Sequence, residues 1–91
     1  MPKTMKLYKP IDVWKRVDEN EAVRYRCFES LKSKRFSVQS ADFYRLPFKE
    51  QQNVNLDRQF VELFLEADPA KRGGEHATLE EAIAAHDKTL S

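Results

Sequence analysis

Hydrophobic and polar positions alternate along residues 22–29, which predicts a half-buried β-strand. Every second residue from Val23 to Cys27 is apolar or aromatic. The opposite face carries two basic residues and one aromatic residue: Arg24, Arg26 and Phe28. The two faces therefore differ in character, and we expect the Val23 face to contact the core.

A second strand is predicted over residues 35–45, after a short polar connection. Its first apolar residues, Phe36 and Val38, share one face, whereas Phe43 has the opposite parity. The apolar positions thus change sides, and a β-bulge or the end of the strand near residues 40–42 would cause this change. These two strands predict an antiparallel hairpin, with Tyr25 and Phe43 projecting from opposite sides.

Residues 11–17 fit two kinds of element. Ile11, Val13 and Val17 would share one face of a strand, while Ile11, Trp14 and Val17 would share one face of a helix. Three β-branched residues among seven favour the strand, and the helix stays open as the alternative.

Helical spacing begins at Leu56, where apolar residues recur at i, i+4, i+7 and i+8 as far as Phe64. Asn53 or Asn55 is expected to cap this helix, because an Asn side chain accepts hydrogen bonds from free backbone amides. The helix is expected to end at Asp68, since the residue before a proline avoids the helical region.

A second helix is predicted from Thr78, because Thr78 and Glu81 have the spacing of a capping box. Leu79, Ile83 and His86 then line one face of it. Residues 68–77 are interpreted as a loop.

The combined pattern predicts an α+β fold in which a small antiparallel sheet of two or three strands packs against two helices. Both helices are expected on the face of Val23, Tyr25 and Cys27. We predict a flexible N-terminal tail over residues 1–10 and a single α+β domain over residues 11–91.

Composition narrows the class of protein. The chain has 91 residues, of which 41% are hydrophobic and 34% charged. These values argue against a disordered segment and against a membrane protein. The single cysteine excludes an internal disulfide and fits a reducing compartment. No secretory signal pattern is recognised at the N-terminus. A cytoplasmic location is therefore expected.

Charge is unevenly distributed although the net charge is only +1. Residues 1–50 carry a net charge of +5, and residues 51–91 carry a net charge of −4. Either the two parts attract each other, within one chain or between two chains, or a positive face serves an anionic partner.

Side chains that could support catalysis are few. Cys27 is expected to be a buried, inert core residue, and its neighbours Arg24 and Arg26 point to the other face of the strand. His76 and His86 lack the spacing of metal ligands. We therefore predict no enzyme, no cofactor, no metal and no small-molecule substrate. A small enzyme using Cys27 or a histidine is the least favoured hypothesis.

Surplus aromatic residues favour a binding role. If one sheet face packs on the helices, large rings on the other face need a partner, because contiguous apolar patches are rarely left bare. The leading hypothesis is a non-catalytic protein-interaction module, which could self-associate. The alternative is binding of single-stranded nucleic acid by the basic, aromatic hairpin 22–49. The candidate partner-binding residues are Trp14, Arg24, Arg26, Phe28, Arg35 and Phe43.

The hairpin segments Arg24–Glu29 and Val38–Pro47 resemble a pattern found in small uncharacterised bacterial proteins. The segments Gln59–Phe64 and Leu79–Ile83 resemble other parts of the same pattern. The resemblance implies a bacterial, cytosolic origin, and it implies no activity, cofactor or partner.

Overall fold

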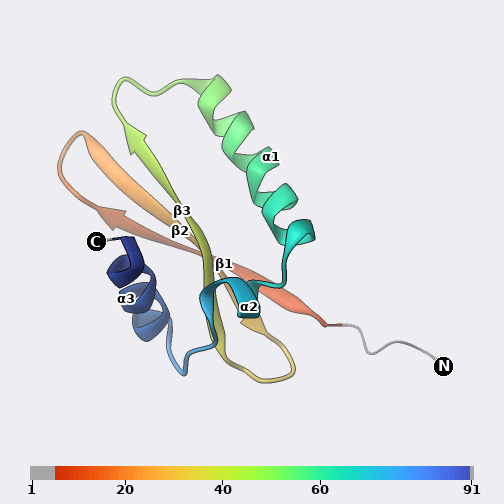
Figure 1. The fold of residues 1–91 in the computed structure, drawn as a ribbon. Helices are drawn as coiled ribbons and strands as arrows, with labels where there is room; N and C mark the ends of the chain where they lie inside the picture. Colours follow the sequence, from red (N-terminus) through yellow and green to blue (C-terminus); the bar gives the residue numbers. More distant parts are fainter. Residues whose placement is uncertain (1–5, 91) are drawn as a thin grey trace.

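The fold is a three-stranded antiparallel sheet flanked by helices, as the computed structural model of residues 6–90 shows (Figure 1). The strands follow the order β1-β2-β3 across the sheet. The elements are β1 (Tyr8–Arg16), β2 (Glu21–Ser30), β3 (Phe36–Arg45), α1 (Glu50–Glu66), α2 (Pro69–Gly73) and α3 (Leu79–Leu90). The predicted α+β class is confirmed.

Residues 11–17 belong largely to a strand, so the favoured interpretation of this segment is confirmed. β1 begins at Tyr8, however, inside the segment 1–10 that was predicted to be a tail. Tyr8 and Lys6 both bind the Asp68 carboxylate, and these contacts hold the start of the strand against the start of α2. The predicted tail is therefore wrong for Tyr8–Pro10, and residues 1–5 lie outside the described residues.

The predicted irregularity in β3 is present, and it changes which face Phe43 occupies. Cys27 pairs with Val38, whereas Arg26 pairs with Ser40, so Gln39 is one extra residue on β3. Beyond this bulge, Val23 pairs with Phe43. Residues that pair directly across an antiparallel ladder project to the same face. The prediction that Phe43 and Tyr25 lie on opposite faces is therefore wrong, because the extra residue restores the parity.

The two long helices cover opposite faces of the sheet (Figure 1). On one face, Ala82 of α3 joins the core cluster of Val23, Tyr25, Cys27 and Val38. On the other face, the ring of Phe28 contacts two rings of α1, Phe60 at 5.5 Å and Phe64 at 5.0 Å between centroids. The prediction that both helices share the Val23 face is wrong for α1. Helical periodicity identifies the apolar side of a helix but not the sheet face that it meets.

Helix α1 starts earlier than predicted and is loosely attached. It begins at Glu50 rather than Leu56, and its N-cap residue Lys49 makes no side-chain capping bond. Neither predicted cap, Asn53 or Asn55, is used. No residue of α1 is fully buried. Its position therefore depends on partly buried contacts rather than on a deep core.

The segment between α1 and α3 is more ordered than predicted, because residues 69–73 of the expected loop form α2. The Asp68 side chain accepts from the Ala70 amide and caps this short helix. Gly73 packs so closely on β3 that a Cβ atom there would lie 2.2 Å from the Val38 carbonyl oxygen. At α3, the Thr78 hydroxyl accepts from the Glu81 amide at 3.1 Å, as the capping box predicts.

The two edges of the sheet differ. Near the start of β3, its outer edge is occupied by His76, which exchanges two backbone hydrogen bonds of 2.8 Å with Phe36. Within residues 6–90, no segment pairs with the outer edge of β1. The sheet therefore presents one complete free edge. None of the helices within residues 6–90 is long and apolar enough to cross a membrane.

Candidate interaction surface

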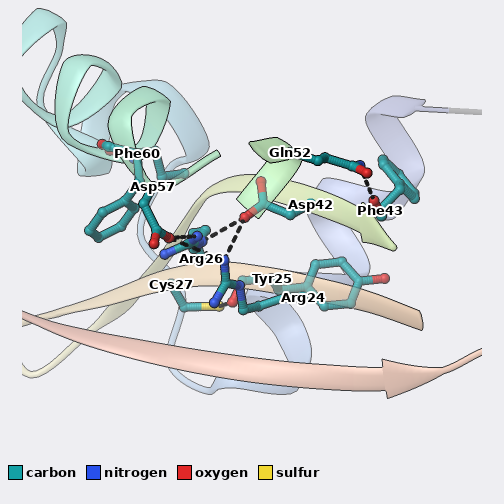
Figure 2. A network of polar contacts seen from close by, with 10 residues as sticks. Arg24, Tyr25, Arg26, Cys27, Asp42, Phe43, Gln52, Asp57 and Phe60 are labelled. Carbon is teal, nitrogen blue, oxygen red and sulfur yellow. Dashed lines mark hydrogen bonds and ion pairs between the residues drawn. The ribbon is translucent and has the colours of Figure 1, made fainter. Parts of the chain in front are cut away.

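A network of four charged side chains, three of them largely buried, joins the sheet to α1 (Figure 2). The Nε atom of Arg26 lies 2.7 Å from an oxygen of Asp42, and its Nη2 atom lies 2.8 Å from an oxygen of Asp57. Arg24 approaches the same two carboxylates at 3.3 and 3.5 Å. Two strands and one helix thus supply a closed set of two cations and two anions.

Burial and ion pairing shift the pKa of Arg26 in opposite directions. Burial favours loss of the charge, but hydrogen bonds to Asp57 and Asp42 outweigh it, and the pKa of Arg26 is raised. The same hydrogen bond from Arg26 lowers the pKa of Asp57. Both groups therefore stay charged, and the Arg26 side chain, 6% exposed, is directed inward.

Arg24 lies against two aromatic rings at the margin of this network. Its guanidinium carbon is 5.2 Å from the centre of the Trp14 ring and 5.4 Å from that of Tyr44. These distances are typical of cation–π contacts. The Trp14 ring is nevertheless 56% exposed. It belongs to β1, the strand with the free edge.

Large hydrophobic residues are exposed at several places on the described surface. Within residues 6–89, six hydrophobic residues are buried, whereas ten large hydrophobic residues are exposed. The exposed ones are Leu7, Trp14, Val17, Leu31, Phe43, Leu46, Phe48, Val54, Val61 and Leu65. Several of them surround the end of the sheet that contains the β1–β2 turn and the last residues of β3. We call this region the open end; it is made by residues 14–23 and 41–48.

The open end contains a hollow of about 470 Å³ on the face that α3 covers only in part. Its apolar lining includes Val17, Val23, Ala41 and Phe43, and Phe43 is 62% exposed. Charged groups of both signs also line it, namely Lys15, Glu21, Arg45 and Asp87. An apolar floor with charges of both signs is a common arrangement in protein interfaces.

The six predicted partner-binding residues do not form one site. Trp14 and Phe43 are exposed near the open end. Phe28 is buried beneath α1, and Arg24 and Arg26 are held in the internal ion pairs. Arg35 is exposed in the β2–β3 turn, at the other end of the sheet.

Sequence reasoning missed two groups of residues in and near this region. Leu46 and Phe48 are isolated apolar residues beside turns, and no periodicity marks them. Val17 fits the periodic pattern of residues 11–17, but that pattern does not show that it is exposed. Asp42 and Asp57 are far apart in the chain, and neither has a pattern that reveals its pairing with Arg26. One signal was available for Asp42, since a carboxylate within an apolar strand needs a cationic partner when it is buried.

Cys27 is buried, and neither it nor the histidines belong to a metal-binding group within the described residues. The Cys27 side chain is 1% exposed, and burial raises the pKa of its thiol to about 12. A thiol with such a pKa is protonated at neutral pH and is a poor nucleophile. Within residues 6–90, no group of three His, Cys, Asp or Glu side chains is placed to hold a metal ion.

Comparisons with protein families, curated proteins and solved structures find no match for this chain. The resemblance of the hairpin segments to small bacterial proteins therefore stays a prediction.

Proposed function

We propose that the protein is a non-catalytic protein-interaction module that associates with a second copy of itself. The observation that carries the proposal is the group of exposed hydrophobic residues at the open end, namely Trp14, Val17, Phe43, Leu46 and Phe48. Exposed apolar patches of this kind are normally covered by a partner. In a two-fold interface each surface meets its own copy, so a rim with both signs of charge can pair with itself. The open end has such a rim.

The nucleic-acid alternative receives less support from the same contacts. It depends on Arg24, Arg26 and Arg35 as free cations. Two of these three arginines are neutralised by Asp42 and Asp57. A phosphate backbone would have to compete with those internal carboxylates.

Self-association is tested by light scattering coupled to size-exclusion chromatography over a hundred-fold range of concentration. The wild type should shift from one chain towards two as concentration rises. Val17→Ser should weaken this association without lowering the melting temperature, because Val17 lines the hollow of the open end and is 49% exposed. The matched control is Leu65→Ser, an exposed residue at the far end of α1, which should change neither property. A wild type that stays a single chain at every concentration would overturn the proposal.

A further inference from the structure

The free edge of β1 has a defined set of outward backbone groups. The carbonyl of Leu7 accepts from the Leu31 amide, and the amide of Val17 donates to the Glu21 carbonyl, each at 3.0 Å. These two residues flank β1, and both direct their bonding groups towards β2. Because successive residues in a strand alternate, the even-numbered residues of β1 direct their amides and carbonyls away from β2.

Pro10 agrees with this assignment. It is even-numbered, and a proline is tolerated in a strand where the missing N–H would face away from the neighbouring strand. The residues from Asp12 to Arg16 follow without another proline. This stretch therefore offers the complete outward groups of Asp12, Trp14 and Arg16 to an added strand.

Two copies of β1 can pair antiparallel only in registers that keep side chains on matching faces. A register centred on Asp12 places this carboxylate against its own copy and Lys9 against Lys15. Like charges directly opposite each other destabilise a ladder. A register centred on Val13 places Ile11 against Lys15 and Asp12 against Trp14, so it forms no ion pair across the ladder.

The register centred on Trp14 also places Val13 against Lys15, but of the three registers it alone brings opposite charges together within β1. It places Asp12 against Arg16 twice, once on each side of the axis, and it places Ile11 against Val17. The two Trp14 rings then meet at the axis. Asp12 and Arg16 are both exposed in the single chain, so the opposite charges are accessible for pairing.

We propose that β1 pairs antiparallel with β1 of a second copy, centred on Trp14, to form a continuous six-stranded sheet. This proposal rests on the self-association proposed above and gives it a geometry. The pairing covers the free edge of the sheet and the exposed Trp14 ring. It also brings Ile11 of one copy beside Val17 of the other, next to the hollow of the open end.

Cysteine scanning along β1 tests the register directly. Asp12→Cys, Val13→Cys, Trp14→Cys and Lys15→Cys are each oxidised gently with oxidised glutathione, and cross-linked dimers are measured on non-reducing gels. Only the residue on the axis faces its own copy, and a hydrogen-bonded pair has Cα atoms about 5.5 Å apart, within the range that a disulfide spans. Trp14→Cys should therefore cross-link at least ten-fold faster than the other three. Wild-type chain, with its buried Cys27, is the background control.

A charge exchange provides a second test that retains the tryptophan. Arg16→Asp should weaken dimerisation ten-fold or more, because it places two carboxylates opposite each other on both sides of the axis. The double variant Asp12→Arg, Arg16→Asp should recover most of the loss. Arg35→Asp, the same reversal at the other end of the sheet, should have no effect. Circular dichroism confirms that each variant is folded.

The outcomes separate the two proposals. The β1 register is overturned if the dimer cross-links fastest at another position, or if the charge exchange leaves dimerisation unchanged. Self-association itself stands in both cases. A wild type without any dimer overturns both. Emission from Trp14, the one tryptophan of the chain, gives an independent reading, because it should shift to shorter wavelength as the dimer forms.

Discussion

Arg26 is the residue on which the α1 side of the sheet depends most. Its side chain is 6% exposed and balanced by Asp42 within the sheet and by Asp57 from the helix. A buried ion pair adds little net stability, but removing one partner leaves an uncompensated charge. Asp42, itself buried, is the partner that water can least replace.

Asp42→Ala should lower the free energy of unfolding by about 3–5 kcal/mol, because the buried Arg26 charge loses its closest carboxylate. Urea denaturation followed by circular dichroism measures this change. The control is Glu21→Gln, which removes an exposed ion pair with Arg45 and should cost less than about 1 kcal/mol. Equal losses in the two variants would contradict the importance assigned to burial.

At the scale of elements, β1 is attached to α2 through a single carboxylate. Asp68 accepts hydrogen bonds from Lys6, Tyr8 and the Ala70 amide. The Lys6 and Tyr8 bonds lower the pKa of Asp68 to about 2. Burial and the same carboxylate raise the pKa of Tyr8 to about 12. One ionised group thus connects the start of the sheet to the helical segment.

The Asp68 contacts predict an acid-sensitive contribution to stability. A carboxyl whose pKa is lowered on folding stabilises the fold above its unfolded pKa of about 3.9 and loses this effect as the pH falls towards 2. The difference in unfolding free energy between wild type and Asp68→Asn should therefore be constant near pH 6 and shrink between about pH 4 and pH 2. Glu62→Gln, an exposed carboxylate of α1, is the control. A difference that stays constant down to pH 2 would refute the assignment.

Helix α1 is the element expected to open first. It has no fully buried residue, and Phe60 and Phe64 are its aromatic contacts with Phe28. Amides of α1 should exchange with deuterium faster than those of β2, since local opening costs least where few apolar groups are buried. Phe60→Ala should accelerate exchange in α1 more than in β2. The adjacent exposed residue gives the matched control Val61→Ala, which should leave the exchange pattern unchanged.

At the scale of the whole molecule, some of the unevenly distributed charges pair with each other within the chain. Arg26 meets Asp57 and Lys6 meets Asp68, so the basic first half binds the acidic second half at two places. The Asp42 pairs, by contrast, lie within the first half. The proposed dimer adds the Asp12–Arg16 pairs between copies.

Added salt should therefore weaken dimerisation but should not abolish it, because the ion pairs are only part of the interface. The interionic screening length falls from about 10 Å at 0.1 M salt to about 3 Å at 1 M, which reduces the attraction between exposed Asp12 and Arg16. Sedimentation equilibrium should show a dimer dissociation constant that rises several-fold over this range. The double variant with exchanged charges should show the same dependence. A dissociation constant that decreases as the salt concentration rises would indicate purely apolar association.

The sequence predicted two of the strands and the two long helices because each carries its own periodicity, whereas residues 11–17 fitted both a strand and a helix. Residues 22–29 alternate with period two, and Leu56–Phe64 repeat with the period of a helix. The capping bond from the Glu81 amide to Thr78 was also predictable, since both groups lie within one turn. The candidate surface was predicted only through Trp14 and Phe43. Its remaining residues lie beside turns, where no periodic pattern indicates exposure.

The sequence alone determined most of the local structure. It indicated which segments form strands, which form helices, and which side of each is apolar. Tertiary structure decided which sheet face α1 covers, which residues balance Arg26, and which strand edge stays open. The physical reason is the distance along the chain over which each interaction acts. Backbone preferences and amphipathic spacing act over a few neighbouring residues, whereas the bulge at Gln39 and the pairing of Arg26 with Asp57 depend on segments that meet only in the folded chain.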